Sequence, residues 1–334
     1  MKLLIQCLRI TSVIAVTAVF LPLSMLSQEK EPVVMIFAGD VVLSDHVEAF
    51  VKGRTEYVFE LWKPGKESDI FMVNLEHPVT MATDRVEKKY NFKMNPVYGA
   101  TLVDAGITIV NAANNHIFDY GLQGMEDTMR FLDSLEIAYV GLGGNLAQAR
   151  KPVVMRRKGW AVGFLGYYGG GEFSAGKNTP GFAPRYARFM VEDIRDLKKK
   201  ADYVVVNLHW GTERAPEPEG WQIQLAHRLV DAGADLIVGH HPHVLQGIEE
   251  YKGATIAFSL GNFVFGGNTR HTYDTAVLKV TISGAAPVVE LVPVTVTRWQ
   301  PRPSSPPATR EVLELVRERS ANLHHHPFFS GAQE

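Results

Sequence analysis

The chain has 334 residues, of which 46% are hydrophobic, enough for one large or two ordinary domains with a substantial core. Its 34 Lys and Arg residues are balanced by 36 Asp and Glu residues, and no basic stripe accompanies the formal net charge of -2, which argues against nucleic acid as a partner. Cys7 is the only cysteine, so the folded body has no disulfide, no thiolate metal ligand and no cysteine nucleophile. Any bound metal must therefore be held by nitrogen and oxygen atoms.

The amino-terminal region, residues 1–31, has the pattern of a targeting segment. Lys2 and Arg9 precede an apolar stretch at 10–26, which gives way to the polar residues 27–32. No Ala-x-Ala cleavage site is present, and the stretch is close to the shortest that spans a bilayer, so a cleaved signal peptide and a retained membrane anchor both remain open. The pattern predicts an extracytoplasmic protein of the cell envelope or periplasm, either secreted or membrane-anchored.

From residue 33 onward, strand-like and helix-like segments alternate, which predicts an α/β domain with a largely parallel central sheet over residues 32–300. Periodic apolar residues predict helices at 122–135, 191–200 and 221–232. Alternating segments at 276–282 and 288–296 predict strands of a second sheet that packs on the first. Residues 301–334 are expected to form a peripheral tail with a short helix at 310–319.

Five apolar runs, each predicted as a buried strand, end in polar side chains that can bind metals. Ligands of parallel sheets collect at the carboxyl ends of the strands, so we expect these side chains to form one site. The residues at the five ends are Asp40; Asn74 and Glu76; Asn114, Asn115 and His116; His209; and His240, His241 and His243.

This donor set predicts a metal site of mixed nitrogen and oxygen character. Imidazole, carboxylate and amide donors suit zinc, manganese or iron better than calcium or magnesium. A bridging Glu76 could hold two ions, which would activate water and stabilise the oxygens of a phosphoryl or acyl centre. The proposed ligands are Asp40, Glu76, Asn115, His209, His241 and His243.

His116 is the candidate proton-transfer residue beside this site. It follows Asn115 directly, and in that position it could act as a general acid on the leaving group. Asp119 could orient the imidazole, or it could cap the helix that follows Gly121. Asn262 follows another apolar run and could shape the metal pocket. The loop between residues 167 and 190 is unusually long, and it could either cover the site or be a structural excursion.

Five segments in order resemble the CapA-type poly-γ-glutamate capsule synthesis family, over roughly residues 33–265. They are Asn74-Leu75-Glu76, the residues 113–119, His209-Trp210-Gly211-Thr212-Glu213, the residues 241–246, and Ser259-Leu260-Gly261-Asn262-Phe263. That family is similar to the calcineurin-like metallophosphoesterases, so the resemblance implies a two-sheet sandwich flanked by helices. It also implies metal-ligand roles for Asp40, Asn115 and the histidines, and a proton-donor role for His116.

The resemblance has two departures, of which the first is that Glu76 stands where phosphoesterases usually have a bridging aspartate. Phosphoesterases generally carry a histidine two residues after the first aspartate, where this chain has Val42, so the first metal shell is one nitrogen short. Asp45 or His46 could compensate. Glu213 could support the site from beyond the direct ligands. Arg85 and Lys93 could meet an anionic substrate, or they could lie in an ordinary solvated loop.

The function implied is metal-dependent hydrolysis or transfer on an anionic polymer, a peptide or a phosphoryl group in poly-γ-glutamate capsule biosynthesis. The resemblance also implies contact with membrane proteins of capsule synthesis or export. The alternative is a non-catalytic component of polymer export or anchoring that keeps the metal site for stability or for grasping carboxylates. These two functions differ in whether His116 is needed for turnover.

Overall fold

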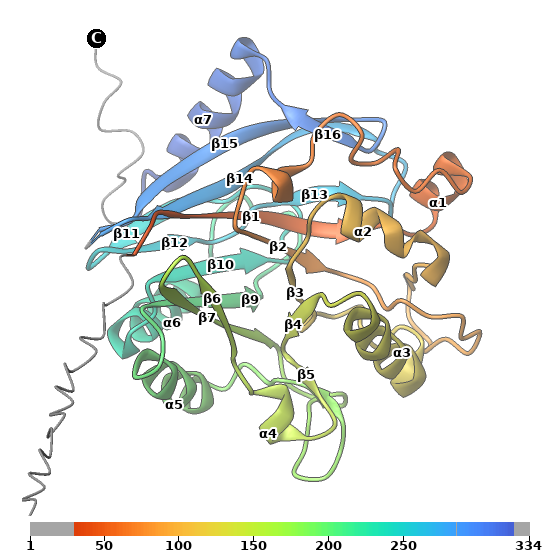
Figure 1. The fold of residues 1–334 in the computed structure, drawn as a ribbon, viewed down its shortest axis with the longest axis horizontal. Helices are drawn as coiled ribbons and strands as arrows, with labels where there is room; N and C mark the ends of the chain where they lie inside the picture. Colours follow the sequence, from red (N-terminus) through yellow and green to blue (C-terminus); the bar gives the residue numbers. More distant parts are fainter. Residues whose placement is uncertain (1–29, 285, 324–334) are drawn as a thin grey trace, which may run out of the picture.

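The computed structural model describes residues 30–284 and 286–323, which form two β-sheets packed face to face (Figure 1). The first sheet has eight strands in the order β16-β15-β14-β1-β2-β3-β4, with β13 paired to the part of β1 that β14 leaves free. Its strands are β1 (Val33–Val42), β2 (Ile70–Leu75), β3 (Ile109–Asn111), β4 (Ala138–Val140), β13 (Asn262–Phe265), β14 (Thr272–Ile282), β15 (Val288–Thr297) and β16 (Gln300–Pro303).

The second sheet has six strands in the order β11-β12-β10-β9-β7-β6. Its central strands are parallel, and the hairpins β6-β7 and β11-β12 close its two edges. The strands are β6 (Val153–Arg157), β7 (Trp160–Tyr168), β9 (Tyr203–His209), β10 (Leu236–His240), β11 (Ile248–Tyr251) and β12 (Ala254–Ala257); β5 (Leu142–Gly143) and β8 (Gly181–Phe182) form a separate short pair.

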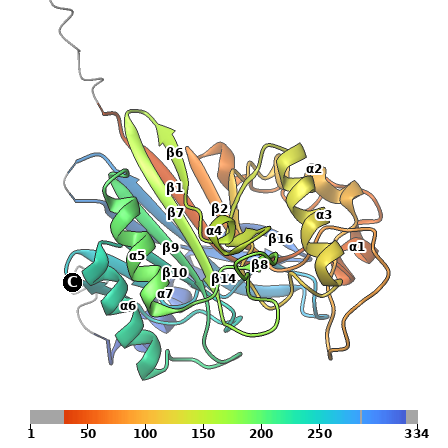
Figure 2. The ribbon, with the colours of Figure 1, turned by 90° about the horizontal axis from the view of Figure 1, so that it is seen from below.

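Helices cover the outer faces of both sheets. Figure 2 shows α5 (Ala187–Lys198) and α6 (Gly220–Ala232) beside the second sheet, and α2 (Ala100–Asp104) and α3 (Gly121–Ser134) on the opposite side. The remaining short helices are α1 (His46–Val51), α4 (Leu146–Ala149), η1 (Pro64–Lys66) and η2 (Pro96–Gly99). The α/β sandwich flanked by helices is therefore confirmed.

The apolar residues of β1 show how one strand serves two layers of core. Because successive side chains of a strand point to opposite faces, Ile36 and Ala38 join the core beneath α2 and α3, whereas Met35 and Phe37 join the core between the two sheets. All four are almost completely buried. A strand with both faces covered reads as a continuous apolar run, which is why its sequence carries no alternation.

The placement of the late strands corrects one prediction. The segments at 276–282 and 288–296 do form strands, but β14 and β15 extend the first sheet instead of building a second one. Residues Val33 to Phe37 of β1 pair antiparallel with Ile282 to Leu278 of β14. Alternation in a sequence indicates a half-buried strand, yet it carries no information about which partner supplies the hydrogen bonds.

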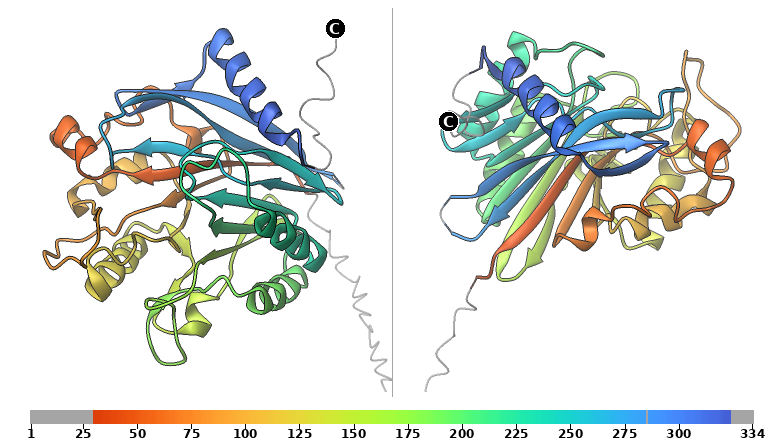
Figure 3. Two further views of the ribbon diagram at one scale, coloured as in Figure 1. Left: turned by 180° about the vertical axis from the view of Figure 1, so that it is seen from behind. Right: turned by 90° about the horizontal axis from the view of Figure 1, so that it is seen from above.

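The last helix, α7 (Pro306–Ser320), packs against β14 and β15 of the first sheet and against β11 of the second (Figure 3). Its Val312 and Val316 are buried in the core between the sheets. The helix starts four residues earlier than residue 310, with Pro306 in its first turn, where proline's fixed φ suits a helix start and its missing N–H costs no hydrogen bond.

The predicted targeting segment at 1–31 lies outside the described residues, apart from Lys30 and Glu31. Within the described ranges, no helix combines the length and the apolar character needed to cross a membrane.

Candidate metal centre

The predicted site residues come together where the carboxyl ends of strands from both sheets meet. Asp40 and Glu76 stand at the ends of β1 and β2 in the first sheet, whereas His209 ends β9, and His241 and His243 follow β10 in the second. These side chains form overlapping groups whose ligand atoms lie within 4.8 Å of one another.

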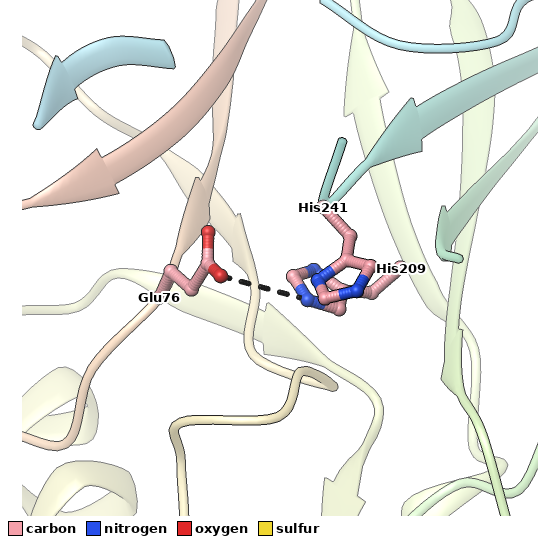
Figure 4. Close-up of side chains that lie close together, drawn as sticks. All are labelled: Glu76, His209 and His241. Atoms are coloured by element: carbon pink, nitrogen blue, oxygen red, sulfur yellow. Dashed lines mark ion pairs between the residues drawn. The ribbon is translucent and has the colours of Figure 1, made fainter. Parts of the chain in front are cut away.

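One group consists of Glu76, His209 and His241 (Figure 4). His209 Nε2 lies 3.6 Å from Glu76 Oε1, and both side chains are completely buried. The rings of His209 and His241 have their centroids 4.7 Å apart. A carboxylate and two imidazoles so placed can converge on one ion.

A second group consists of Asp40, Glu76 and His243. His243 Nδ1 lies 3.1 Å from Asp40 Oδ2, and His243 Nε2 lies 3.6 Å from Glu76 Oε1. Glu76 therefore belongs to both groups, as expected of a carboxylate shared by two ions. Glu213, which is exposed, forms a third group with His241 and His243.

Unpartnered polar atoms show that these residues fit a cation. Glu76 Oε1 and His241 Nδ1 are buried and have no hydrogen-bond partner. Leaving such atoms unpaired costs roughly 1–3 kcal/mol each, more for a charged group. A divalent ion held by nitrogen and oxygen donors would pair them and would stabilise the ionised forms of the buried carboxyl groups of Asp40 and Glu76.

The pKa values of the histidines reflect the same crowding of charge. Burial, reinforced by the neighbouring His243, lowers the pKa of His241 to about 4. Burial also holds the pKa of His209 well below its usual value. His243 is the exception: burial acts to lower its pKa, but the carboxylates of Glu76 and Asp40 outweigh that effect and raise it to about 9.

The loop that carries the last two histidines has an uncommon backbone conformation. His241 has a φ of 97° and His243 a φ of 57°, a region that side chains other than glycine rarely adopt. Gly239 precedes them at a point where a Cβ atom would lie 1.8 Å from the carbonyl oxygen of Phe258. The close backbone contact and the left-handed residues together aim both imidazoles at the site.

Two asparagines hold the ligands from the side of the first sheet. Asn115 Oδ1 lies 2.8 Å from His209 Nε2, the nitrogen that faces Glu76. The Asn74 amide donates to Asp40 Oδ1 at 2.8 Å and to Glu76 Oε2 at 3.3 Å. Asn74 was expected at this convergence of strand ends, but no role as a ligand or as a support for the ligands was predicted for it from the sequence.

His116 and Asp119 form a buried pair beside these ligands. His116 Nδ1 lies 2.7 Å from Asp119 Oδ2, and burial lowers the pKa of His116 although Asp119 opposes the change. Lys88 donates to Asp119 Oδ1 at 2.5 Å and to the Asn115 carbonyl oxygen at 2.9 Å. Lys88 was missed because it stands in a charged run that the sequence alone gives no reason to place near a site.

The alternative role of Asp119 as a helix cap is wrong. The N-cap position of α3 is Tyr120, which makes no side-chain capping bond. The Asp119 carboxylate instead accepts hydrogen bonds from the Phe92 backbone N–H at 2.6 Å and from Lys88, in addition to its contact with His116. The ring of Phe92 packs on His116 with centroids 4.4 Å apart.

The predicted substrate-side residues lie at different places around the centre. Asn262 Oδ1 is 2.9 Å from His243 Nδ1. Arg85 is exposed and lines a cavity of about 600 Å³ together with Lys88. Lys93 donates to the Ala82 carbonyl oxygen at 2.6 Å, and its ammonium group lies over the ring of Tyr120.

The missing histidine at position 42 is not replaced by either predicted substitute. Val42 is fully buried against Phe92 and Phe265. Asp45 and His46 are exposed, and neither belongs to a metal-binding group in the described part of the chain. His240 lies nearer: its Nδ1 is 3.6 Å from Asp40 Oδ1, buried and without a hydrogen-bond partner.

Comparison with known proteins identifies the class. Residues 34–267 match the family described as bacterial capsule synthesis protein PGA_cap. The matched range contains the five strand ends and all the predicted ligands. The chain belongs to this family.

Two relatives make the membership more particular. The chain is 36% identical over 275 residues to the PGA biosynthesis protein CapA of Bacillus subtilis, a match that spans 80% of this chain and 72% of that protein. It is also 36% identical over 292 residues to the capsule biosynthesis protein CapA of Bacillus anthracis, spanning 83% of this chain and 70% of the relative. The resemblance to CapA-type proteins is thus confirmed.

A solved structure shares the fold. A hypothetical protein from Thermus thermophilus superimposes with a TM-score of 0.50 at 16% identity, over 79% of this chain and 99% of that one. At this identity the likeness concerns the fold alone.

Proposed function

We propose that this protein uses a metal-dependent hydrolase or transferase site on an anionic polymer or phosphoryl group during poly-γ-glutamate capsule biosynthesis. The observation that carries the proposal is a carboxylate, Glu76, shared between two buried ligand groups, with the His116–Asp119 pair beside them. The names of the two Bacillus proteins support the polymer, since one is a PGA biosynthesis protein and the other a capsule biosynthesis protein.

One or two divalent ions of manganese, zinc or iron would be held by a set of buried nitrogen and oxygen donors. They are Asp40, Glu76, Asn115, His209, His241 and His243. A bound ion of this kind supplies Lewis acidity and lowers the pKa of bound water. The amide of Asn74 keeps Asp40 and Glu76 in place for this task.

His116 would exchange a proton with the leaving group. Asp119 accepts a hydrogen bond from Nδ1, which fixes the tautomer and leaves Nε2 as the reactive nitrogen. Lys88 forms an ion pair with the other oxygen of Asp119 at 2.5 Å and so helps to hold that carboxylate in place. Because burial lowers the pKa of His116, its protonated form gives up a proton readily.

The substrate would meet positive charge on the loop that follows Glu76. Arg85 and Lys88 line a cavity together with Phe92, whose ring packs on His116, and Lys93 stands on the same loop. Asn262 and Glu213 would border the substrate on the side of His243. We further propose that the amino-terminal segment directs the protein to the cell envelope, where membrane proteins of capsule synthesis or export would be its partners.

The test separates His116 from the metal. The full-length protein and a His116→Ala variant are incubated with poly-γ-glutamate, a peptide and a phosphomonoester, and products are identified by mass spectrometry. Loss of a proton-transfer residue should lower turnover by about 10²–10⁴-fold while bound metal stays constant. His271→Ala, which removes an exposed histidine just before β14, should leave turnover unchanged.

One observation favours a second function, that of a non-catalytic component of polymer export or anchoring. Val42 stands, buried, where phosphoesterases generally carry a histidine, so the centre could hold metal without supporting their chemistry. In that case His116→Ala would leave the protein's biological function intact, whereas removing His241 and His243 would abolish it.

A further inference from the structure

Arg185 is a half-buried cation that contacts the backbone of the candidate metal ligand His209. It lies between the long loop after β7 and the start of α5. Its Nη1 donates to the carbonyl oxygen of His209 at 3.1 Å. Its guanidinium group lies over the ring of Trp221, with the central carbon 4.6 Å from the ring centroid.

The positive charge of Arg185 is not neutralised within the described ranges. No carboxylate there lies within ion-pair distance of its guanidinium group, and the hydrogen bond to His209 uses one of its five N–H donors. Glu219, the acidic neighbour that influences it, is engaged elsewhere: its carboxylate accepts hydrogen bonds from Thr212 and from the Trp221 indole.

Tyr168, at the end of β7, connects this cation to the metal ligands. Its ring packs against His209 with the centroids 5.3 Å apart. The backbone N–H of Arg185 donates to the Tyr168 carbonyl oxygen at 3.1 Å. Arg185 and the candidate ligand His209 therefore both contact the same tyrosine.

The other cations near the candidate metal centre are either paired with a carboxylate or exposed to solvent. Lys88 pairs with Asp119 at 2.5 Å, and Arg85 is exposed to solvent. A planar guanidinium that is half-buried, lies over an aromatic ring and has further N–H donors is suited to bind two oxygens of one group at once.

We propose that Arg185 is the oxyanion-recognition residue of the metal centre, binding a carboxylate or phosphate group of the substrate beside His209. Trp221 holds the guanidinium in place, and Glu219 holds the indole of Trp221. This inference rests on the proposed function, since it assigns the chemistry that its substrate must present. Poly-γ-glutamate offers carboxylates, and a phosphoryl substrate offers phosphate oxygens.

The test measures binding, not turnover. The metal-loaded full-length chain is titrated calorimetrically with a γ-linked glutamate oligomer and, separately, with inorganic phosphate. Arg185→Gln should weaken binding at least tenfold, with metal content unchanged. Arg185→Lys keeps the charge but loses the planar fork, and it should fall between Arg185→Gln and the unaltered protein.

Arg188→Gln is the matched control, because Arg188 carries the same charge on an exposed position three residues along and stacks only on Phe189. It should bind both probes within twofold of the unaltered protein. Preference for the oligomer identifies the recognised group as carboxylate, and preference for phosphate identifies it as phosphoryl; either result supports the oxyanion site.

Three results would overturn the inference: equal affinity in Arg185→Gln, loss of metal in that variant, or no binding of either probe by the unaltered protein. The proposed chemistry is judged independently, by product formation and its dependence on His116. Failure of the Arg185 inference is therefore distinguishable from failure of the proposed function.

Discussion

The two sheets supply different halves of the metal centre. The first sheet contributes oxygen donors, from Asp40, Glu76 and Asn115, whereas the second contributes the imidazoles of His209, His241 and His243. Both ligand groups that contain Glu76 draw members from the two sheets. We therefore expect metal affinity to depend on how the sheets pack, in addition to the ligands themselves.

Glu76→Gln should have the largest effect on metal binding. It removes the carboxylate that belongs to both buried groups, so each group loses a member. His241→Ala, in contrast, leaves Asp40, Glu76 and His243 together. Elemental analysis after dialysis should show nearly all metal lost in Glu76→Gln and part of it retained in His241→Ala. Equal retention in the two variants would contradict the shared role of Glu76.

Phe37→Ala should damage the interface between the sheets. The side chain is fully buried in the core that joins them, and its removal should lower the free energy of unfolding by about 3–5 kcal/mol through the cavity it leaves. Phe71→Ala is the matched control, since Phe71 is equally buried but lies in the core on the outer face of the first sheet.

Chemical denaturation should report comparable losses for the two phenylalanine variants, whereas metal titration of the folded proteins should separate them. We expect weaker metal binding in Phe37→Ala alone, because only that variant loosens the packing that brings carboxylates to imidazoles. Identical metal affinities in the two variants would contradict the expectation that packing between the sheets positions the ligands.

Asn74→Ala should have a smaller effect, confined to the oxygen half. The amide orients Asp40 and Glu76 without being a predicted ligand, and removing such a support typically costs 10–100-fold in metal affinity. Asn145→Ala, which removes the cap of α4, should leave metal affinity unchanged. Competition with a chromophoric chelator would measure both variants. An unaltered metal affinity in Asn74→Ala would show that the strands orient the two carboxylates without help from the Asn74 amide.

Proton release is the smallest expected signal and sharpens the contrast between the histidines. With a pKa raised to about 9, His243 carries a proton at pH 7, whereas His241, with a pKa of about 4, is neutral. Ligand imidazoles must be neutral, so metal binding should release about one proton at pH 7 and should strengthen as pH rises toward 9. Calorimetry in buffers of different ionisation enthalpy measures this number. Heats independent of the buffer would contradict the raised pKa.

Local patterns in the sequence predicted the elements and most of the site. The helix expected at 221–232 is α6, and the one expected at 122–135 is α3 shifted by one residue. The five strand ends do converge, because the carboxyl ends of parallel strands share an edge even when two sheets divide the strands between them.

Long-range pairing was beyond the sequence. Nothing in residues 272–297 indicates that β14 pairs with the first half of β1 while β13 takes the second half. Lys88 likewise reaches Asp119 across 31 positions, by a loop path that no periodicity encodes. Such contacts depend on which segments, distant in the sequence, meet in the folded protein.

The start of β1 sets the direction in which the protein presents its chemistry. Glu31 and Lys30 are fixed at the amino ends of the strands, by the Trp160 indole and by Asp202, whereas Asp40 stands at the other end of β1. Seven residues of extended strand separate Val33 from Asp40, about 23 Å at roughly 3.3 Å per residue. A protein tethered through its amino side would therefore hold the metal centre outward, with the whole sandwich between its tether and its substrate.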